Sequence, residues 1–148
     1  MHSAIDLNAL ISAAGDSIIA CDAQGLITLW NPASERIFGF TEAEVLGQSL
    51  DIIIPERQRQ RHWDGYHNTM HTGVTRYATD TLRVPALHKD GHTISIAFTV
   101  ALLPPSADGS RTIIAVIREE TARFAEERKL RKEIGELQAK LRALEGAA

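Results

Sequence analysis

Short apolar runs separated by turn residues make up the first 119 positions of the chain. Residues 17–22 and 26–30 are largely apolar and enclose the tetrad Asp-Ala-Gln-Gly at 22–25, which predicts a hairpin of two strands. Residues 93–100 alternate between apolar and polar, so that one face of a third strand is buried. Two further strands are predicted at residues 79–87 and at the largely apolar residues 111–117. The apolar face of the alternating strand holds Ile94, Ile96, Phe98 and Val100.

Helices are predicted between these strands from their start and stop signals. Residues 6–14 form an amphipathic segment with Asp6 as N-cap, and Asn31 followed by a proline opens a second helix that ends at Gly39. Residues 41–47 begin with a capping box, and a longer helix covers about residues 57–71. This order of elements predicts an α+β fold, a five-stranded antiparallel sheet with helices on one face.

The composition changes after residue 119. Residues 121–145 contain no proline, and five apolar residues there are spaced by 4, 3, 4 and 3 positions, which is the a/d seam of a coiled coil. We therefore predict a cap helix over residues 1–15, a compact domain over 16–119 and a coiled-coil helix over 120–148 that forms a homodimer. Packing of this helix on its own sheet is the alternative. The seam residues are Leu130, Ile134, Leu137, Leu141 and Leu144.

Composition narrows the classes of function. The net charge of −3 and the lack of a basic patch argue against nucleic acid as a partner. No apolar run approaches the roughly 18 residues that cross a bilayer, and the first six residues lack a signal-peptide pattern, so we expect a cytoplasmic protein. The single cysteine, Cys21, excludes a disulfide framework. No nucleophile–base set, phosphate loop or kinase motif occurs, which argues against an enzyme.

Several segments, in the same order, resemble the PAS family of sensor domains. The resemblance covers about 115 residues and implies a sheet whose helices close over a pocket, which holds a cofactor or ligand or is filled with side chains. The final segment is similar to the Asp-x-Thr junction that joins PAS domains to signalling helices, with Glu119 in place of the aspartate and Thr121 as the threonine. The segments are residues 22–25 (Asp-Ala-Gln-Gly), 30–40 (beginning Trp-Asn-Pro), 44–47 (Glu-Val-Leu-Gly), 54–56 (Ile-Pro-Glu), 88–91 (His-Lys-Asp-Gly) and 118–121 (Arg-Glu-Glu-Thr).

Residues 61–73 are similar to the haem-binding PAS domain of FixL-type oxygen sensors. Counted back from Thr72 and Gly73 without gaps, His62 falls at the haem-ligating histidine of that family. The resemblance implies b-type haem bound through His62, with O2, CO or NO at the free iron position. It also implies a distal wall of Leu82, Phe98 and Val100. Ile96, Trp63 and Tyr66 are further candidate contacts of the cofactor, where Trp63 is either a packing residue or a border of the haem edge. His67 is the fallback ligand if the helix register differs.

The chain departs from this pattern at one strand position. FixL-type sensors carry an arginine where the gapless alignment places Leu82, and the adjacent Arg83 is expected to point to the other face unless a bulge shifts it. Without that donor, O2 is expected to bind weakly relative to CO.

Other interpretations stay open. Flavin is the main rival cofactor, although the Asn-Cys-Arg-Phe-Leu motif of light-sensing relatives is absent. The domain alternatively binds a small metabolite, or binds nothing and only mediates dimerisation. In each case we expect it to act on a downstream signalling protein such as a histidine kinase or a cyclase. His67 and His71 are spaced like a metal pair without a third ligand, and His88 and His92 are expected to face solvent.

Overall fold

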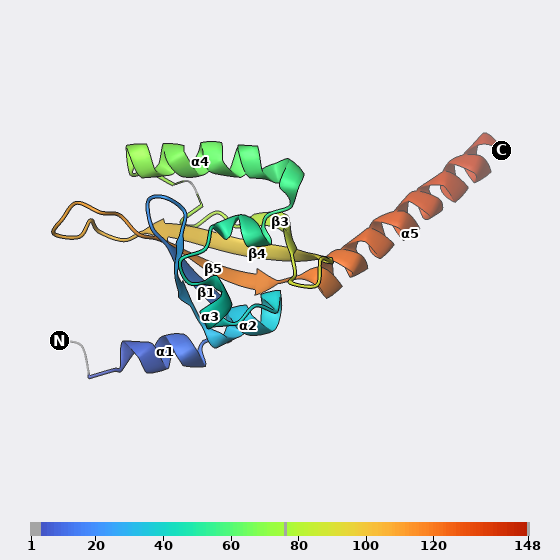
Figure 1. Ribbon diagram of the computed structural model, residues 1–148. Coiled ribbons are helices and arrows are strands. Elements are labelled where there is room, and N and C mark those ends of the chain that lie inside the picture. The colour runs from blue at the N-terminus through green and yellow to red at the C-terminus, as the bar shows by residue number, and fades with distance from the viewer. Residues whose placement is uncertain (1–3, 76, 148) are drawn as a thin grey trace.

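The computed structural model describes residues 4–75 and 77–147, and its centre is one antiparallel sheet. The sheet contains β1 (Ser17–Cys21), β2 (Ile27–Trp30), β3 (Leu82–Leu87), β4 (Thr93–Leu102) and β5 (Ile113–Glu119). Its strand order is β2-β1-β5-β4-β3, with every neighbouring pair antiparallel, which confirms the predicted sheet. The first and last strands of the domain therefore lie side by side at its middle (Figure 1).

Seven helical segments surround or extend the sheet within the described residues, and their ends follow the predicted caps. The Asp6 side chain accepts from two amides of the first helix, Asn31 caps the second, and Thr41 and Glu44 form a reciprocal capping box. The α-helices are α1 (Leu7–Ala13), α2 (Pro32–Phe38), α3 (Glu42–Val45), α4 (Arg59–Thr72) and α5 (Thr121–Gly146), and the 3-10 turns are η1 (Leu50–Ile53) and η2 (Glu56–Gln58).

Some boundaries differ from the predicted ones. β3 begins at Leu82 rather than at residue 79, because residues 77–79 form a turn. β5 covers two residues beyond 117, since Glu119 still pairs with Ile96 on β4. The long helix α4 begins at Arg59, two positions later than predicted, because the chain after Pro55 first forms the 3-10 turn η2.

The core lies between the sheet and the helices that cover it. Trp30 and Phe38 are 1% and 0% exposed, and their ring centroids lie 5.5 Å apart in a tilted pair. The indole Nε1–H of Trp30 donates to the carbonyl of Phe40 at 2.9 Å, so the buried ring leaves no polar atom without a partner. These two fully buried aromatic side chains thereby join β2 to α2.

Asn31 links three elements through one buried amide. Its Oδ1 accepts from the amides of Ile18 at 2.9 Å and Ser34 at 3.1 Å, and from the Ser34 hydroxyl at 2.8 Å. Its Nδ2 donates to the carbonyls of Ile11 and Asp16. With 3% exposure, the side chain replaces water for each of these groups. Asn31 therefore fixes β1 and the end of α1 against the start of α2.

Replacing Asn31 with alanine is expected to reduce the free energy of unfolding by about 3 kcal/mol, because several buried backbone groups lose their partner at once. Urea unfolding followed by circular dichroism measures this change. Asn68→Ala, on the exposed side of α4, is the matched control and should stay within about 0.5 kcal/mol of the wild type. Equal stability of the two variants would contradict this role of Asn31.

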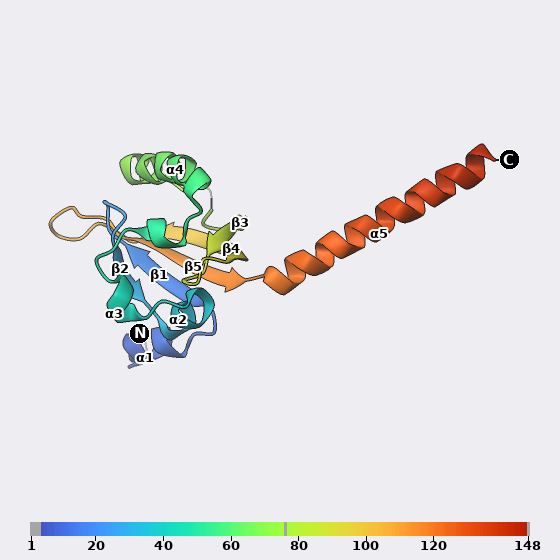
Figure 2. The same cartoon turned by 45° about the vertical axis from the view of Figure 1, so that its right-hand side comes forward.

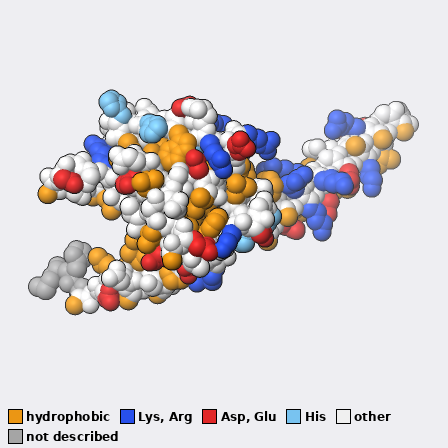
Figure 3. All heavy atoms as spheres, viewed as in Figure 1, with side chains coloured by type: hydrophobic (Ala, Val, Ile, Leu, Met, Phe, Trp, Pro, Cys, Tyr) orange, Lys and Arg blue, Asp and Glu red, His pale blue; other side chains and the backbone are white. Residues whose placement is uncertain are grey.

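The last helix, α5, leaves the domain and projects away from the sheet (Figures 1 and 2). Its seam residues Leu130, Ile134 and Leu137 are 47%, 54% and 62% exposed, so the seam does not pack on the sheet of its own chain. Lys and Arg side chains gather along α5 on the face seen in Figure 3. No described helix combines the length and apolar character needed to cross a membrane.

Candidate functional site

The helix α4 directs its ring side chains to two sides, one toward the sheet and one toward solvent. Tyr66 is 6% exposed, and Trp63 and Met70 pack against the hydrophobic core. His62 lies half-buried beside them, with its ring centroid 4.6 Å from that of Trp63 and 5.8 Å from that of Tyr66. His67 is exposed. The predicted ligand is therefore on the inner side of α4, and the fallback ligand is on the outer side.

His62 carries a buried nitrogen without a partner. Its Nδ1 is the one buried side-chain nitrogen or oxygen, among the described residues, that makes no hydrogen bond. Burial lowers the pKa of the His62 imidazole, the charge of His67 acts in the same direction, and Asp51 opposes both. The ring is therefore held in its neutral form at neutral pH. A neutral imidazole with a buried, unpaired nitrogen has the properties of a metal ligand.

Two hydrogen bonds and one close contact hold this part of α4 in place. The indole Nε1–H of Trp63 donates to the Asp51 carboxylate on η1 at 2.6 Å, and the Tyr66 hydroxyl donates to the carbonyl of Asp22 in the β1–β2 turn. The Trp63 ring lies directly against Gly25, where an added Cβ would stand 2.2 Å from a ring carbon. Gly25 also has a φ of +80°, so this turn requires glycine for two independent reasons.

The residues predicted for the distal wall come from the sheet. Leu82 on β3 stands across from Phe98 on β4, and Phe98 stands across from Ile117 on β5, so the three side chains share one face. Ile96 is 4% exposed, and Phe98 and Val100 are half-buried against the same core that contains Tyr66. The residues predicted for the distal wall thus lie together, on the side of the sheet that α4 covers.

Arg83 points away from this wall. Its neighbour Leu82 faces the core, and no bulge is present in the register from Leu82 to Leu87 that would reverse the alternation. The Arg83 Nε–H donates to the Glu120 carboxylate at 3.1 Å, on the opposite face of the sheet and at the start of α5. No arginine of β3 therefore reaches the space between α4 and the sheet.

A model of the PAS fold matches residues 5–119, more than three quarters of the chain. The chain belongs to the PAS family. The match ends where β5 gives way to α5, so the PAS domain comprises the sheet, α1 to α4 and the connecting turns.

Proteins of known sequence and structure share this PAS domain. A stretch of 73 residues, 49% of the chain, is 37% identical to the sensor protein FixL of Bradyrhizobium diazoefficiens, and 105 residues, 71% of the chain, are 28% identical to the oxygen sensor protein DosP of Escherichia coli. Each matched stretch is 13% of the relative's length. The crystal structure of a PAS domain from Colwellia psychrerythraea has a TM-score of 0.65 at 21% identity, covering 77% of this chain and 93% of that one.

The junction between the PAS domain and α5 is a set of polar contacts centred on Glu120. The Glu120 amide donates to the Ser95 carbonyl at 2.7 Å, and the Ser95 amide donates to the Thr121 hydroxyl at 3.1 Å. Glu120 also pairs with Arg83 and, at 3.5 Å, with Arg123. Thr121 thus contacts β4. Among the described residues the ion pairs at this junction are made by Glu120, and Glu119 is exposed.

Two further residues of the site were not identified by sequence reasoning. Asp51 contacts both Trp63 and, at 4.0 Å, Arg59, and it contributes charge near His62. Asp22 contributes its backbone carbonyl to Tyr66. Neither role has a local sequence signal. The contact of Asp51 with Trp63 spans 12 positions, and that of Asp22 with Tyr66 spans 44 positions and uses a backbone carbonyl, which every residue has.

Proposed function

We propose that this PAS domain binds b-type haem through His62 and senses a diatomic gas, O2, CO or NO. The observation that carries the proposal is the buried, unpartnered Nδ1 of a neutral histidine that lies beside Trp63 and Tyr66 on the inner side of α4. The position of His62 relative to Thr72 and Gly73, and the similarity to the sensor protein FixL and the oxygen sensor protein DosP, support the same assignment.

The residues between α4 and the sheet fit a haem group in their chemistry. His62 supplies a neutral nitrogen ligand, and Ile96, Phe98 and Val100 supply an apolar surface that limits access of water. Haem iron with a single axial histidine supplies a free coordination position for a gas. Leu82 offers this space no hydrogen-bond donor, so we expect the affinity for O2 to be low relative to that for CO.

A domain without a cofactor is the second candidate function. Trp63 and Tyr66 already fill part of the inner side of α4, and both are held by hydrogen bonds to neighbouring turns. A core packed in this way suits a PAS domain that serves only as an interaction and dimerisation module. Binding of flavin or of a small metabolite is the remaining alternative, and no specific contact favours it.

Titration of haem into the purified, tag-free chain tests the proposal. We expect a sharp Soret band that saturates at about one equivalent of haem, since one histidine ligand serves one iron. Reduction and addition of CO should then shift this band. A chain that stays colourless after expression with added haem contradicts the proposal and leaves the interaction module, whereas a flavin spectrum after purification supports the flavin alternative.

The proposed route of the signal runs along β4. This strand carries Phe98 in the predicted distal wall and, three positions earlier, Ser95 in the junction with α5. A displacement of β4 therefore changes the contacts of Glu120 and Thr121 and biases the packing of α5 between two states. We propose that α5 forms a homodimer through its seam and passes the change to a downstream signalling protein, with no catalysis by the PAS domain itself.

A further inference from the structure

The turn between β3 and β4 places two histidines opposite each other. The amide of His88 donates to the carbonyl of His92 at 2.9 Å, and the amide of Gly91 donates to the carbonyl of His88 at 2.9 Å. Gly91 has a φ of +93°, which lets the turn close within three residues. Residues that face each other across a hairpin direct their side chains to the same side. The two imidazoles are accordingly stacked, with centroids 4.6 Å apart and planes inclined by 24°.

Asp90 completes a group of three possible metal ligands. Its Oδ1 lies 3.2 Å from Nδ1 of His88 and also contacts Nδ1 of His92. One ligand atom from each of the three residues lies within 4.8 Å of the others, and no second group of this kind occurs in the described ranges 4–75 and 77–147. Tetrahedral coordination at zinc bond lengths of about 2.0–2.1 Å places neighbouring ligand atoms about 3.3 Å apart. The three donors therefore need only small rotations to share one ion.

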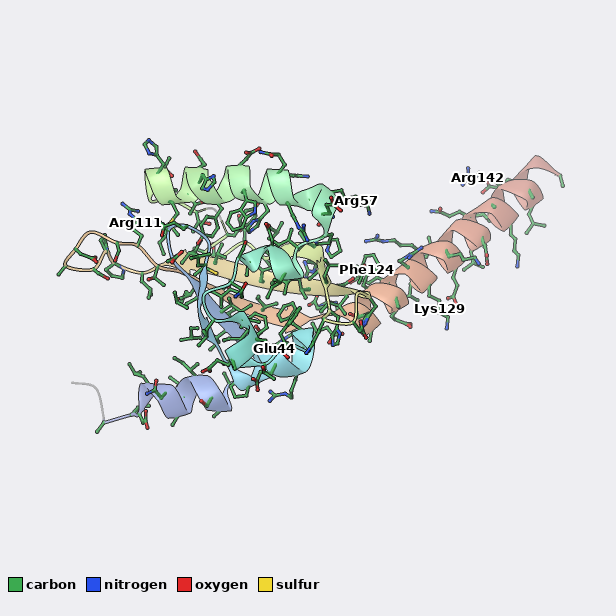
Figure 4. The ribbon with its side chains drawn as sticks, viewed as in Figure 1. Glu44, Arg57, Arg111, Phe124, Lys129 and Arg142 are labelled. Carbon is green, nitrogen blue, oxygen red and sulfur yellow. The ribbon has the colours of Figure 1, made fainter. Side chains whose placement is uncertain are left out.

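The surroundings hold this group in place without blocking it. The His88 ring lies against Gly39, where an added Cβ would stand 2.6 Å from the ring, and its side chain is 24% exposed. The Lys89 amide donates to the Phe38 carbonyl at 2.8 Å, and the Lys89 ammonium pairs with Glu44 (labelled in Figure 4) at 2.6 Å. The nearest cation in the turn is therefore directed to another carboxylate. Asp90 and His92 are 61% and 55% exposed, so an ion can enter from solvent.

The charge of the group suits a divalent cation. The Asp90 carboxylate supplies an oxygen ligand beside the ring nitrogens of His88 and His92. The Asp90 amide donates to Nδ1 of His88 at 3.2 Å, a long hydrogen bond that a bound cation replaces. Two imidazoles and one carboxylate favour late first-row transition metals over Mg²⁺ and Ca²⁺, which prefer oxygen ligands.

We propose that His88, Asp90 and His92 form a binding site for a late first-row divalent metal ion, with Zn²⁺ as the probe. The site is separate from the inner side of α4 and independent of whether His62 binds haem. A bound ion joins the last residue before β4 to the first residue after β3, and so stabilises the turn that rests on α2.

Calorimetric titration of Zn²⁺ into the tag-free, chelator-treated full chain tests this proposal. We expect binding of about one equivalent, with an affinity at least about tenfold weaker in Asp90→Asn and in His92→Ala. His92→Ala keeps the backbone contacts of the turn, because the His92 amide still donates to Asp90, and circular dichroism checks that both variants fold.

The double variant His67→Ala/His71→Ala is the matched control, because it removes two histidines spaced by the same four positions from the exposed side and end of α4. It should bind Zn²⁺ with unchanged affinity, and so should His62→Ala. Absence of binding to the wild type, or equal binding to wild type and His92→Ala, overturns the proposal. Loss of binding in the His67/His71 variant also overturns it and assigns the ion to α4. The absorption spectrum of the Co²⁺-loaded chain provides a second readout, which should change in Asp90→Asn.

Discussion

Replacing His62 with alanine is expected to abolish the Soret band, because the variant lacks the nitrogen that we propose as the iron ligand. The affinity for haem should fall at least about 100-fold, or about 3 kcal/mol. Titration of haem followed at the Soret wavelength measures this loss. Added imidazole should restore a Soret band in His62→Ala, because a free ligand can occupy the space left by the side chain.

The control for this experiment is His67→Ala, five residues further along the same helix. His67 is exposed, so its removal should leave the Soret band in place. A Soret band that survives in His62→Ala and disappears in His67→Ala would assign the iron to the outer side of α4 and contradict our proposal. Because burial lowers the pKa of His62, its imidazole stays neutral at pH values below the ordinary pKa of histidine. The Soret band of the wild type should therefore persist at those pH values as well.

The stability of the haem-free chain tests whether His62 is an iron ligand or a packing residue of the core. A buried polar atom without a partner reduces the free energy of unfolding by about 1–3 kcal/mol. Removing the His62 ring removes this penalty and also removes the packing contacts of the ring, so the two effects oppose each other. The free energy of unfolding of haem-free His62→Ala should therefore stay close to that of the wild type. A large loss of stability without haem would show that the ring serves the core instead.

Leu137→Asp is expected to convert a dimer of the chain into monomers. Leu137 is the central residue of the seam and is 62% exposed, and a carboxylate there would face the same position of the partner helix in a parallel pair. Because the apolar seam is only about two heptads long, one charge should weaken the dimer at least about 100-fold. Sedimentation equilibrium of wild type and variant measures the dissociation constants.

Ala139→Asp is the matched control, since it introduces the same charge two residues further along α5, outside the seam. It should leave the dimer intact. If the wild type is monomeric at all accessible concentrations, or if both variants dissociate equally, α5 does not form the proposed coiled coil. Arg123 and Glu127, which occupy the seam closer to the sheet, pair with each other at 3.3 Å and are not expected to contribute much to such a dimer.

Most of the fold follows from local sequence signals. The caps at Asp6, Asn31 and Thr41 and the stop at Gly39 were predicted correctly because each depends on residues at most three or four positions apart. The start of β3 was placed too early, because residues 77–79 form a turn and the ladder with β4 begins only at Leu82. Strand pattern alone does not identify where hydrogen bonding begins.

The site was predictable where a register applied and unpredictable where distant residues meet. His62 and Leu82 were selected from the register of the family resemblance, and the face that holds Ile96 and Phe98 follows from the strand period. Asp51 beneath Trp63 and Glu120 beside Arg83 depend on contacts across 12 and 37 positions, which no local pattern encodes. The expectation that His88 faces solvent was wrong in part, because its ring rests on Gly39 at the end of α2.

The contact of Trp63 with Gly25 has a consequence for how motion of α4 spreads. The β1–β2 turn is bound to α4 through Trp63 and Tyr66, and β1 forms a full ladder with β5, the strand that continues into α5. An outward shift of α4 therefore pulls on the β1–β2 turn. The displacement can then reach α5 along the adjacent central strands β1 and β5, without passing along β3 or β4. Arg118 on β5, paired with Asp16 before β1, lies at the far end of that path, three positions before α5 begins at Thr121.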